Sequence, residues 1–269
     1  MKKILFFIGM CLWMSFAWAA DYAAIDKYAH DAPPLRSKSG LNQLVRYLTK
    51  PYKTDVEKAR VILAWIVHNI DYDEFKYKAI EDDLDRTKKK DKELFVAQND
   101  ILETRIGVCA DIAELYKRMA NIAGLSAVVI NGNAGYDVTF EQFENRDSAH
   151  TWNAVKIDRE WEYVDPTWAM DGEDTHGLGD VSKAKEYKKT IKERSKKNSD
   201  AKLPRDGRFV NDQWFLTNKE EMIKTHFPDD EKWQLQKKKL TKDEFLGLKG
   251  KDLRDAKREY EKSKRKNVR

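Results

Sequence analysis

Two strand-like runs separated by only two residues constrain the fold of this 269-residue chain more than any other feature. The runs are Thr151 to Ile157 and Glu160 to Val164, and Asp158-Arg159 lies between them. Because a two-residue loop joins antiparallel neighbours, this spacing predicts a β-hairpin in which Ile157 opposes Glu160. Arginine at the second loop position is not the usual glycine or asparagine, so this register is a prediction at risk.

The same register decides where two polar residues at the outer ends of the hairpin are placed. Continued past the strands, it sets Asp165 opposite Trp152, two residues from His150. Opposed residues share a face, and so do residues two apart on a strand. His150 and Asp165 are therefore expected on one face, with their Cα atoms roughly 7–8 Å apart. A regular three-residue loop would put the two side chains on opposite faces.

An amphipathic stretch with a cysteine at its start precedes the hairpin. It begins at Cys109 and ends at Gly124, a natural C-terminal stop, and Gly107 permits a tight entry. Its apolar residues recur at helical spacing: Ile112, Leu115, Tyr116, Met119 and Ile122. A helix N-terminus favours the thiolate form of cysteine, because partial positive charge and free N–H groups lie near the sulfur.

Two more helices are predicted upstream. One covers Leu41 to Leu48, and the other begins at the capping box Thr54-Asp55-Val56-Glu57 and ends near Asn69. With the hairpin, these elements predict an α+β fold, in which N-terminal helices and the Cys109 helix pack on an antiparallel sheet. The stretch from Gly132 to Ser148 is polar and contains glycine, so we expect a long functional loop there.

Cys109, His150 and Asp165 supply a thiol, an imidazole and a carboxylate in that order. These are the parts of an activated nucleophile: Cys109 attacks, His150 acts as general acid and base, and Asp165 orients the imidazole. The backbone N–H of Cys109 can supply one oxyanion donor, and the amide side chain of Gln98 is a candidate for another. The alternative for Cys109 is a buried cysteine that acts only as a small hydrophobic residue.

The first 19 residues have the pattern of a secretory signal peptide. Lys2 and Lys3 precede an apolar run from Ile4 to Trp18, and Ala17-Trp18-Ala19 gives a small-x-small cleavage site. We therefore expect cleavage near Ala19 and a secreted or periplasmic protein. Cys109 would then have no partner for an internal disulfide in an oxidising compartment.

The remaining chain is predicted to form one domain over residues 20–235, with charged insertions at about 76–95 and 183–200, and a basic tail over 236–269. From Lys237 to Arg269 there are 14 Lys and Arg against 6 Asp and Glu, a net charge of +8, whereas the whole chain carries +5. Such a tail is typical of a solvated end, or of a segment attracted to an anionic surface. No nucleic-acid-binding motif is recognised, so no nucleic acid partner is expected.

Several short motifs occur in an order that resembles the transglutaminase-like superfamily, in particular its kyphoscoliosis-peptidase-like branch. They are Glu57-Lys58-Ala59-Arg60, Trp65-Ile66, Asn69-Ile70-Asp71-Tyr72-Asp73, Arg105-Ile106-Gly107-Val108-Cys109, His150-Thr151-Trp152-Asn153-Ala154-Val155, Val164-Asp165-Pro166-Thr167-Trp168, Trp214-Phe215-Leu216, Thr225-His226-Phe227-Pro228 and Trp233-Gln234-Leu235. The resemblance implies a papain-like core up to about Leu235. It also implies catalytic roles for Cys109, His150 and Asp165, and no cofactor.

The leading hypothesis is therefore an enzyme that acts on peptide or protein amides through a thioester acyl-enzyme. The resemblance to a peptidase-like branch favours hydrolysis, and a protein-crosslinking acyltransferase is an alternative. A second alternative is a catalytically silent module that binds peptide, cell-wall polymer or a partner protein. A metal site is not expected, because the five histidines show no paired ligand spacing and Asp171-Gly172-Glu173-Asp174 does not match an EF-hand loop.

Overall fold

A computed structural model describes most of the chain beyond its N-terminus, with several internal gaps. The described residues are 22–33, 40–74, 76–77, 101–172, 189, 191–193, 207–247 and 249–267. The predicted signal peptide (1–19), Gln98 and most of both charged insertions lie outside them. None of the described helices has the length and apolar character needed to cross a membrane.

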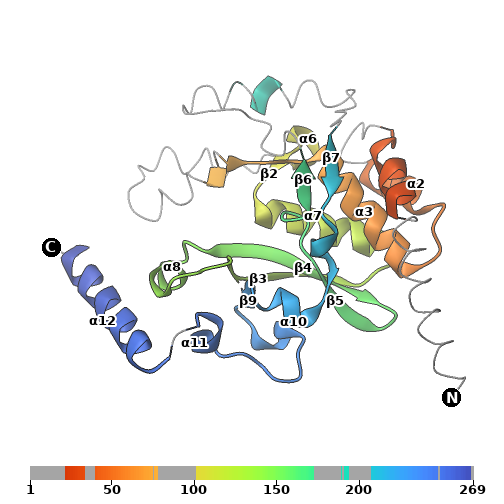
Figure 1. The fold of residues 1–269 in the computed structure, drawn as a ribbon. Coiled ribbons are helices and arrows are strands. Elements are labelled where there is room, and N and C mark those ends of the chain that lie inside the picture. Colours follow the sequence, from red (N-terminus) through yellow and green to blue (C-terminus); the bar gives the residue numbers. More distant parts are fainter. Residues whose placement is uncertain are drawn as a thin grey trace, which may run out of the picture.

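A five-stranded antiparallel sheet forms the centre of the fold (Figure 1). Its strands, in spatial order, are β8 (Phe215–Thr217), β5 (Glu160–Val164), β4 (Ala149–Ile157), β3 (Ala127–Ala134) and β9 (His226–Pro228). The central strand β4 is paired on both sides and carries His150 near its start. The predicted antiparallel sheet is confirmed.

The β4–β5 hairpin has the predicted register. Ile157 opposes Glu160, and the pairing continues without a shift to Asn153 opposite Val164. The two loop residues adopt positive φ angles, 48° at Asp158 and 76° at Arg159, as a two-residue turn matched to the strand twist requires. Arg159 therefore occupies a conformation that glycine or asparagine usually takes.

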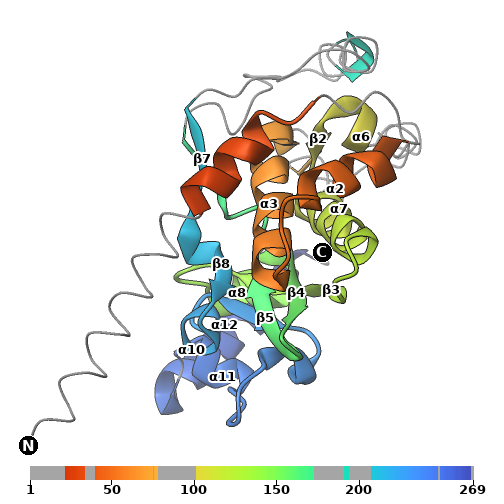
Figure 2. The same cartoon turned by 90° about the vertical axis from the view of Figure 1, so that its right-hand side faces the viewer.

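Helices cover one face of this sheet. Figure 2 shows α2 (Leu41–Thr49), α3 (Asp55–Asn69) and α7 (Cys109–Ile122) gathered above the strands. The predicted capping box at the start of α3 is confirmed: Glu57 N–H donates to Thr54 Oγ1 (3.2 Å) and Thr54 N–H donates to Glu57 Oε2 (2.9 Å). Because α2, α7 and β7 (Arg208–Val210) all contact α3, this helix is buried along most of its length.

Two small sheets lie at the helical end of the molecule. The strands β1 (Asp71–Tyr72) and β2 (Ile106–Gly107) pair in parallel, and β6 (Met170–Gly172) pairs antiparallel with β7. A short helix, α6 (Ile101–Thr104), leads into β2. The β1–β2 pairing continues past Tyr72, because Asp73 N–H donates to Gly107 O (3.0 Å). The segment before α7 is thus fixed to the end of α3.

A buried ion pair connects β7 to the same place. Arg208 and Asp71 have fully buried side chains, and Nη2 of the guanidinium lies 2.5 Å from the carboxylate. Nη1 of Arg208 also donates to the carbonyls of Ile70 (2.8 Å) and Val67 (3.2 Å) at the end of α3. The guanidinium therefore neutralises the buried Asp71 carboxylate and also donates hydrogen bonds to carbonyls at the end of α3.

Helical structure replaces part of a segment that the sequence predicts to be a loop. The expected loop from Gly132 to Ser148 is wrong in part, because its start extends β3 and α8 (Phe140–Asn145) lies within it. The physical reason is a capping box, in which the Gln142 N–H donates to Thr139 Oγ1 (3.2 Å) and Thr139 N–H donates to Gln142 Oε1 (3.0 Å). Polar composition alone does not reveal such a short capped helix.

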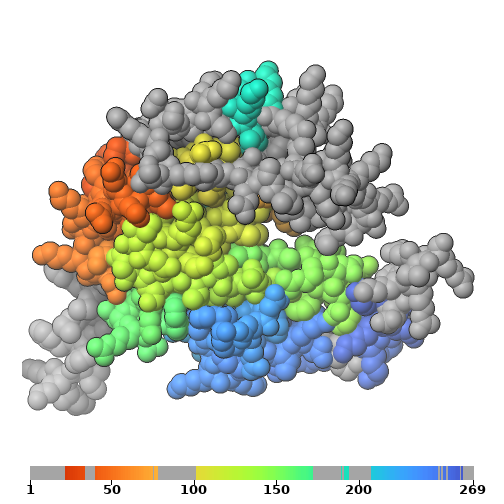
Figure 3. Space-filling view, turned by 180° about the vertical axis from the view of Figure 1, so that it is seen from behind, coloured from red at the N-terminus to blue at the C-terminus, as the bar shows by residue number. Residues whose placement is uncertain are grey.

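The predicted basic tail contains α11 (Lys242–Phe245) and α12 (Gly250–Asn267), after α10 (Lys219–Met222) and the 3-10 turns η2 (Asp212–Trp214) and η3 (Glu231–Gln234). The ring of Tyr260 in α12 packs edge-on against Phe140 of α8, with 5.8 Å between centroids. Seen from behind, the C-terminal segments (blue) lie on the side opposite the N-terminal helices (orange), with α7 and the sheet between them (Figure 3). Attraction of this segment to an anionic surface stays a prediction.

Gly132 lies where β3 and β9 are in close contact, so a larger residue there should destabilise the fold. A Cβ atom there would lie 2.2 Å from the carbonyl oxygen of Phe227 and 2.6 Å from the Trp152 ring. We predict that Gly132→Ala lowers the free energy of unfolding by at least about 2 kcal/mol, because the two strands must separate. Urea unfolding of both proteins measures this difference.

Gly135→Ala is the matched control, because an added Cβ there would meet only a methyl group of Val138, at 2.7 Å. That side chain can rotate away, so the control should lose less than about 1 kcal/mol. Equal losses in the two variants would contradict the strand-separation argument.

Candidate active site

Cys109 is the first residue of α7, as the sequence predicts. It follows Gly107, where an added Cβ would lie 2.8 Å from Ile101 Cδ1 and 2.9 Å from Asp111 Cβ, so the tight entry depends on glycine. The Asp111 carboxylate accepts the Val108 N–H (3.1 Å) and the Lys76 ammonium (2.7 Å). Its charge thus stabilises the helix end and is offset by Lys76.

His150 and Asp165 meet on one face of the sheet, at the end of the hairpin. Nε2 of His150 lies 2.7 Å from Oδ2 of Asp165. The side chain of Cys109 lies near the same imidazole and contributes to raising its pKa. Because Nε2 is occupied by Asp165, Nδ1 is the ring nitrogen left for the thiol. The structure therefore brings Cys109, His150 and Asp165 together, whereas Gln98 lies outside the described residues.

One buried side chain aligns the helix that carries the thiol with the strand that carries the imidazole. Asn153 of β4 is fully buried, and its Nδ2 donates to the carbonyls of Ala113 in α7 (3.0 Å) and Val128 in β3 (2.9 Å). Ala113 lies one turn after Cys109, and Asn153 lies three residues after His150. Sequence reasoning missed this role, because nothing local reveals the partner of a buried amide.

Asp165 is fully buried and accepts hydrogen bonds on both oxygens. Oδ1 accepts the backbone N–H groups of Thr167 (2.9 Å) and Trp168 (3.1 Å), which belong to the turn that follows β5. Oδ2 faces His150 and also Nε2 of His226, at 3.0 Å. Four donors from three parts of the chain thus converge on this carboxylate.

His226 is the site residue that sequence reasoning missed. It starts β9, which pairs with β3, whereas the sequence alone assigned it no role in the site. Its Nδ1 lies 2.8 Å from Thr225 Oγ1. A three-residue strand placed 61 residues after Asp165 leaves no local pattern to find. The one available signal is its presence among the motifs shared with the superfamily.

The charges of this group follow from burial and from the contacts within it. Burial alone would favour a neutral ring, but the negative charge of Asp165, its hydrogen bond and the contact with Cys109 raise the pKa of His150 to about 10. Burial would also raise the pKa of Asp165, but the charges and hydrogen bonds of His150 and His226 hold it well below its usual range. Burial, reinforced by the charge of His150, lowers the pKa of His226 despite Asp165. We therefore assign an imidazolium to His150, a carboxylate to Asp165 and a neutral ring to His226.

The same three residues form the one metal-ligand-like group found among the described residues, with ligand atoms within 4.8 Å of one another. Their Nε2–Oδ2 distances of 2.7 and 3.0 Å are those of hydrogen bonds. Ligand atoms around a tetrahedral zinc ion lie about 3.3 Å apart, given bond lengths of about 2.0–2.1 Å. The spacing therefore fits a hydrogen-bonded network rather than a metal centre.

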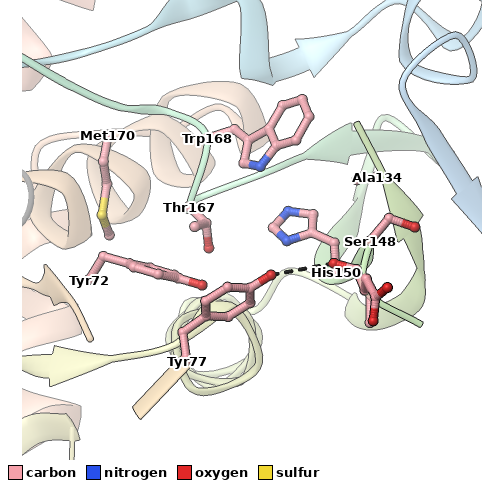
Figure 4. Close-up of a pocket in the computed structure, with 10 residues that line it drawn as sticks. Tyr72, Tyr77, Ala134, Ser148, His150, Thr167, Trp168 and Met170 are labelled. Carbon is pink, nitrogen blue, oxygen red and sulfur yellow. Dashed lines mark hydrogen bonds between the residues drawn. The ribbon is translucent and has the colours of Figure 1, made fainter. Parts of the chain in front are cut away.

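A cavity of about 360 Å³ opens beside the imidazole (Figure 4). Its lining residues are Tyr72, Tyr77, Ala134, Asp147, Ser148, Ala149, His150, Thr167, Trp168 and Met170. In Figure 4, the rings of Tyr72 and Tyr77 lie across the cavity from Trp168, and Tyr77 donates to the carbonyl of Asp147 (3.5 Å). The Thr167 hydroxyl is buried without a hydrogen-bond partner among the described residues. The cavity can thus hold a group with an apolar body and a hydrogen-bonding atom.

The charge assignment can be tested by ¹⁵N NMR of the histidine side chains. We predict that His150 is doubly protonated at neutral pH and loses its proton at about pH 10, whereas His226 carries one proton. Because the His150 pKa is higher in the folded state than the reference of about 6.5, this pair stabilises the fold fully below that pH and loses its contribution as pH rises through about 10. Asp165→Asn should lower the His150 pKa. A neutral His150 at neutral pH in the unaltered protein would contradict the assignment.

Comparison with known proteins identifies the family to which the chain is similar. Residues 42–166 match the Transglutaminase-like superfamily. The kyphoscoliosis peptidase of Mus musculus is 31% identical over 218 residues, which cover 81% of this chain and 27% of that protein. Hillarin of Drosophila melanogaster is 33% identical over 241 residues, which cover 85% of this chain and 24% of that protein.

The chain thus spans about a quarter of the length of these relatives. Among solved structures, a TGase crystal structure is similar with a TM-score of 0.36 and 17% identity over 56% of this chain and 34% of that chain. The sequence matches carry the assignment: the chain belongs to the transglutaminase-like superfamily and is similar to its kyphoscoliosis peptidase branch.

Proposed function

We propose that this protein is a cysteine-dependent enzyme that acts on the amide bonds of peptides or proteins through a thioester intermediate. The observation that carries the proposal is the buried His150–Asp165 pair, 2.7 Å apart, whose imidazole also interacts electrostatically with Cys109 at the first position of α7. A thiol beside a charged imidazole that is held by a carboxylate is the arrangement that cysteine nucleophiles use.

The first step forms the acyl-enzyme. Cys109 attacks as the thiolate of an ion pair with the His150 imidazolium, and its sulfur forms a C–S bond with the carbonyl carbon of the substrate amide. As the C–N bond breaks, the imidazolium of His150 gives its proton to the departing amine nitrogen. Asp165 keeps its negative charge throughout and holds the ring in place. The Cys109 N–H, which has no intrahelical acceptor at this position, can donate to the oxyanion.

The second step releases the acyl group. Neutral His150 takes a proton from water, which attacks the thioester carbon, and the C–S bond breaks to give a carboxylic acid. A primary amine in place of water would give a new amide instead. We propose hydrolysis as the physiological outcome, supported by the similarity to kyphoscoliosis peptidases.

The cavity beside His150 suits a peptide. Its aromatic walls can bury the body of a side chain, and the Thr167 hydroxyl can pair with a polar atom of the substrate. We also propose that the enzyme is exported after cleavage near Ala19, on the basis of the apolar N-terminal run. A mature protein beginning at Ala20, found by mass spectrometry of the exported form, would support this; retention of residues 1–19 would contradict it.

Cys109→Ala provides the direct test of the enzyme proposal. We expect turnover to fall by at least about 10³-fold, because the nucleophile is lost, while circular dichroism and the unfolding midpoint stay close to those of the unaltered protein. Activity is measured on a pool of quenched-fluorescent peptides, with products identified by mass spectrometry. Adding a fluorescent primary amine to a second set of reactions separates acyl transfer from hydrolysis.

Met119→Leu is a matched control on the same helix, because Met119 is buried in the core away from the thiol and the exchange conserves volume. It should keep full activity. Unchanged turnover in Cys109→Ala would refute the proposal. A thiol in the folded protein that does not react with iodoacetamide, together with absent turnover, would instead indicate a silent binding module.

A further inference from the structure

We infer that His226 is a positioning residue of this site: held by Thr225, it donates a hydrogen bond to Asp165 and fixes the carboxylate in the orientation that His150 requires. The inference rests on the proposed function, because the position of His150 matters only for the proposed reaction. His226 lies outside residues 42–166, which match the superfamily, so it is contributed by a later part of the chain.

The two imidazoles share one carboxylate oxygen. Oδ2 of Asp165 lies 2.7 Å from Nε2 of His150 and 3.0 Å from Nε2 of His226, and each of the three side chains is at most 9% exposed. With His150 as its sole partner, Oδ2 could follow the ring as it moves. A second donor on another strand, together with the two backbone N–H groups on Oδ1, removes that freedom.

The proton on His226 can be assigned from its neighbours. A carboxylate oxygen only accepts hydrogen bonds, so Nε2 of His226 must carry the proton that faces Asp165. In a neutral ring Nδ1 is then an acceptor, and the Thr225 hydroxyl, 2.8 Å away, must donate to it. The Thr225 hydroxyl has one proton, and its other contact, Met222 O, is longer at 3.3 Å. Thr225 therefore selects the tautomer of His226 that donates to Asp165.

The surroundings of His226 hold its ring rigidly and keep water out. Three tryptophan rings surround it, with centroids 4.5 Å away for Trp168, 5.0 Å for Trp152 and 5.3 Å for Trp214. An apolar side chain could fill this position in the core. A buried imidazole, in contrast, costs free energy unless both ring nitrogens form hydrogen bonds. Both are satisfied here, by Asp165 and Thr225. A hydrogen bond in such a dry environment is also stronger than one exposed to water.

The test compares His226→Leu with His226→Gln. Leucine fills part of the space without a donor, whereas the glutamine amide can still donate to Asp165 Oδ2 and so serves as the conservative rescue. We expect His226→Leu to lower kcat by about tenfold to a hundredfold with little change in KM, and His226→Gln to recover most of the loss. The rate at which iodoacetamide alkylates Cys109 should follow the same order.

Proton NMR gives a readout that does not depend on turnover. The short hydrogen bond between His150 and Asp165 should produce a strongly deshielded N–H proton signal. We expect that signal to be lost or broadened in His226→Leu and retained in His226→Gln. Thr225→Val and Thr225→Ser form a second pair, for use if His226→Leu does not fold: valine removes the hydroxyl and should weaken the signal, and serine should restore it.

The outcomes separate the inference from the proposed function. If His226→Leu lowers only the unfolding midpoint, and kcat, alkylation and the deshielded proton are unchanged, His226 is a packing residue and the inference is overturned. If the unaltered protein shows no turnover but the proton signal is lost in His226→Leu and kept in His226→Gln, the positioning role holds and the enzyme proposal fails.

Discussion

The buried carboxylate of Asp165 is the group around which the rest of the site is organised. A negative charge without water must be compensated, and here the compensation comes from the imidazoles of β4 and β9 and from the turn after β5. These three parts of the chain can converge only if the sheet has its observed strand order and register. The strand order and register of the sheet therefore supply the hydrogen-bond donors that the buried Asp165 carboxylate requires.

Cys109, the proposed nucleophile, reaches this group from a different layer of the fold. Its position depends on how α7 lies on β3 and β4, and the Asn153 amide fixes that alignment through one carbonyl on each side. Behind α7, the Arg208–Asp71 pair secures the end of α3 and the strand leading to Gly107. Polar groups buried at layer boundaries, rather than apolar packing alone, thus set the distance between thiol and imidazole.

Local patterns predicted the parts of this molecule that depend on neighbouring residues. The Asp158-Arg159 loop predicted the hairpin register, the capping box predicted the start of α3, and the apolar spacing after Cys109 predicted α7. The roles of Asn153 and His226 escaped prediction, because the partners that define these roles lie at least 25 residues away in sequence and no periodicity connects them. Gln98 lies outside the described residues, so its candidate role stays a prediction.

The parallel pairing of β1 with β2 has a consequence for how such proteins can diversify. It joins the chain on either side of residues 78–100 within two residues of α7, through Tyr72 opposite Gly107. The entropy of closing a loop grows only with the logarithm of its length, so the intervening segment can gain or lose residues at little cost in stability. A change in the length of this segment therefore leaves Cys109, His150 and Asp165 in register, because the strands at either end of it stay paired.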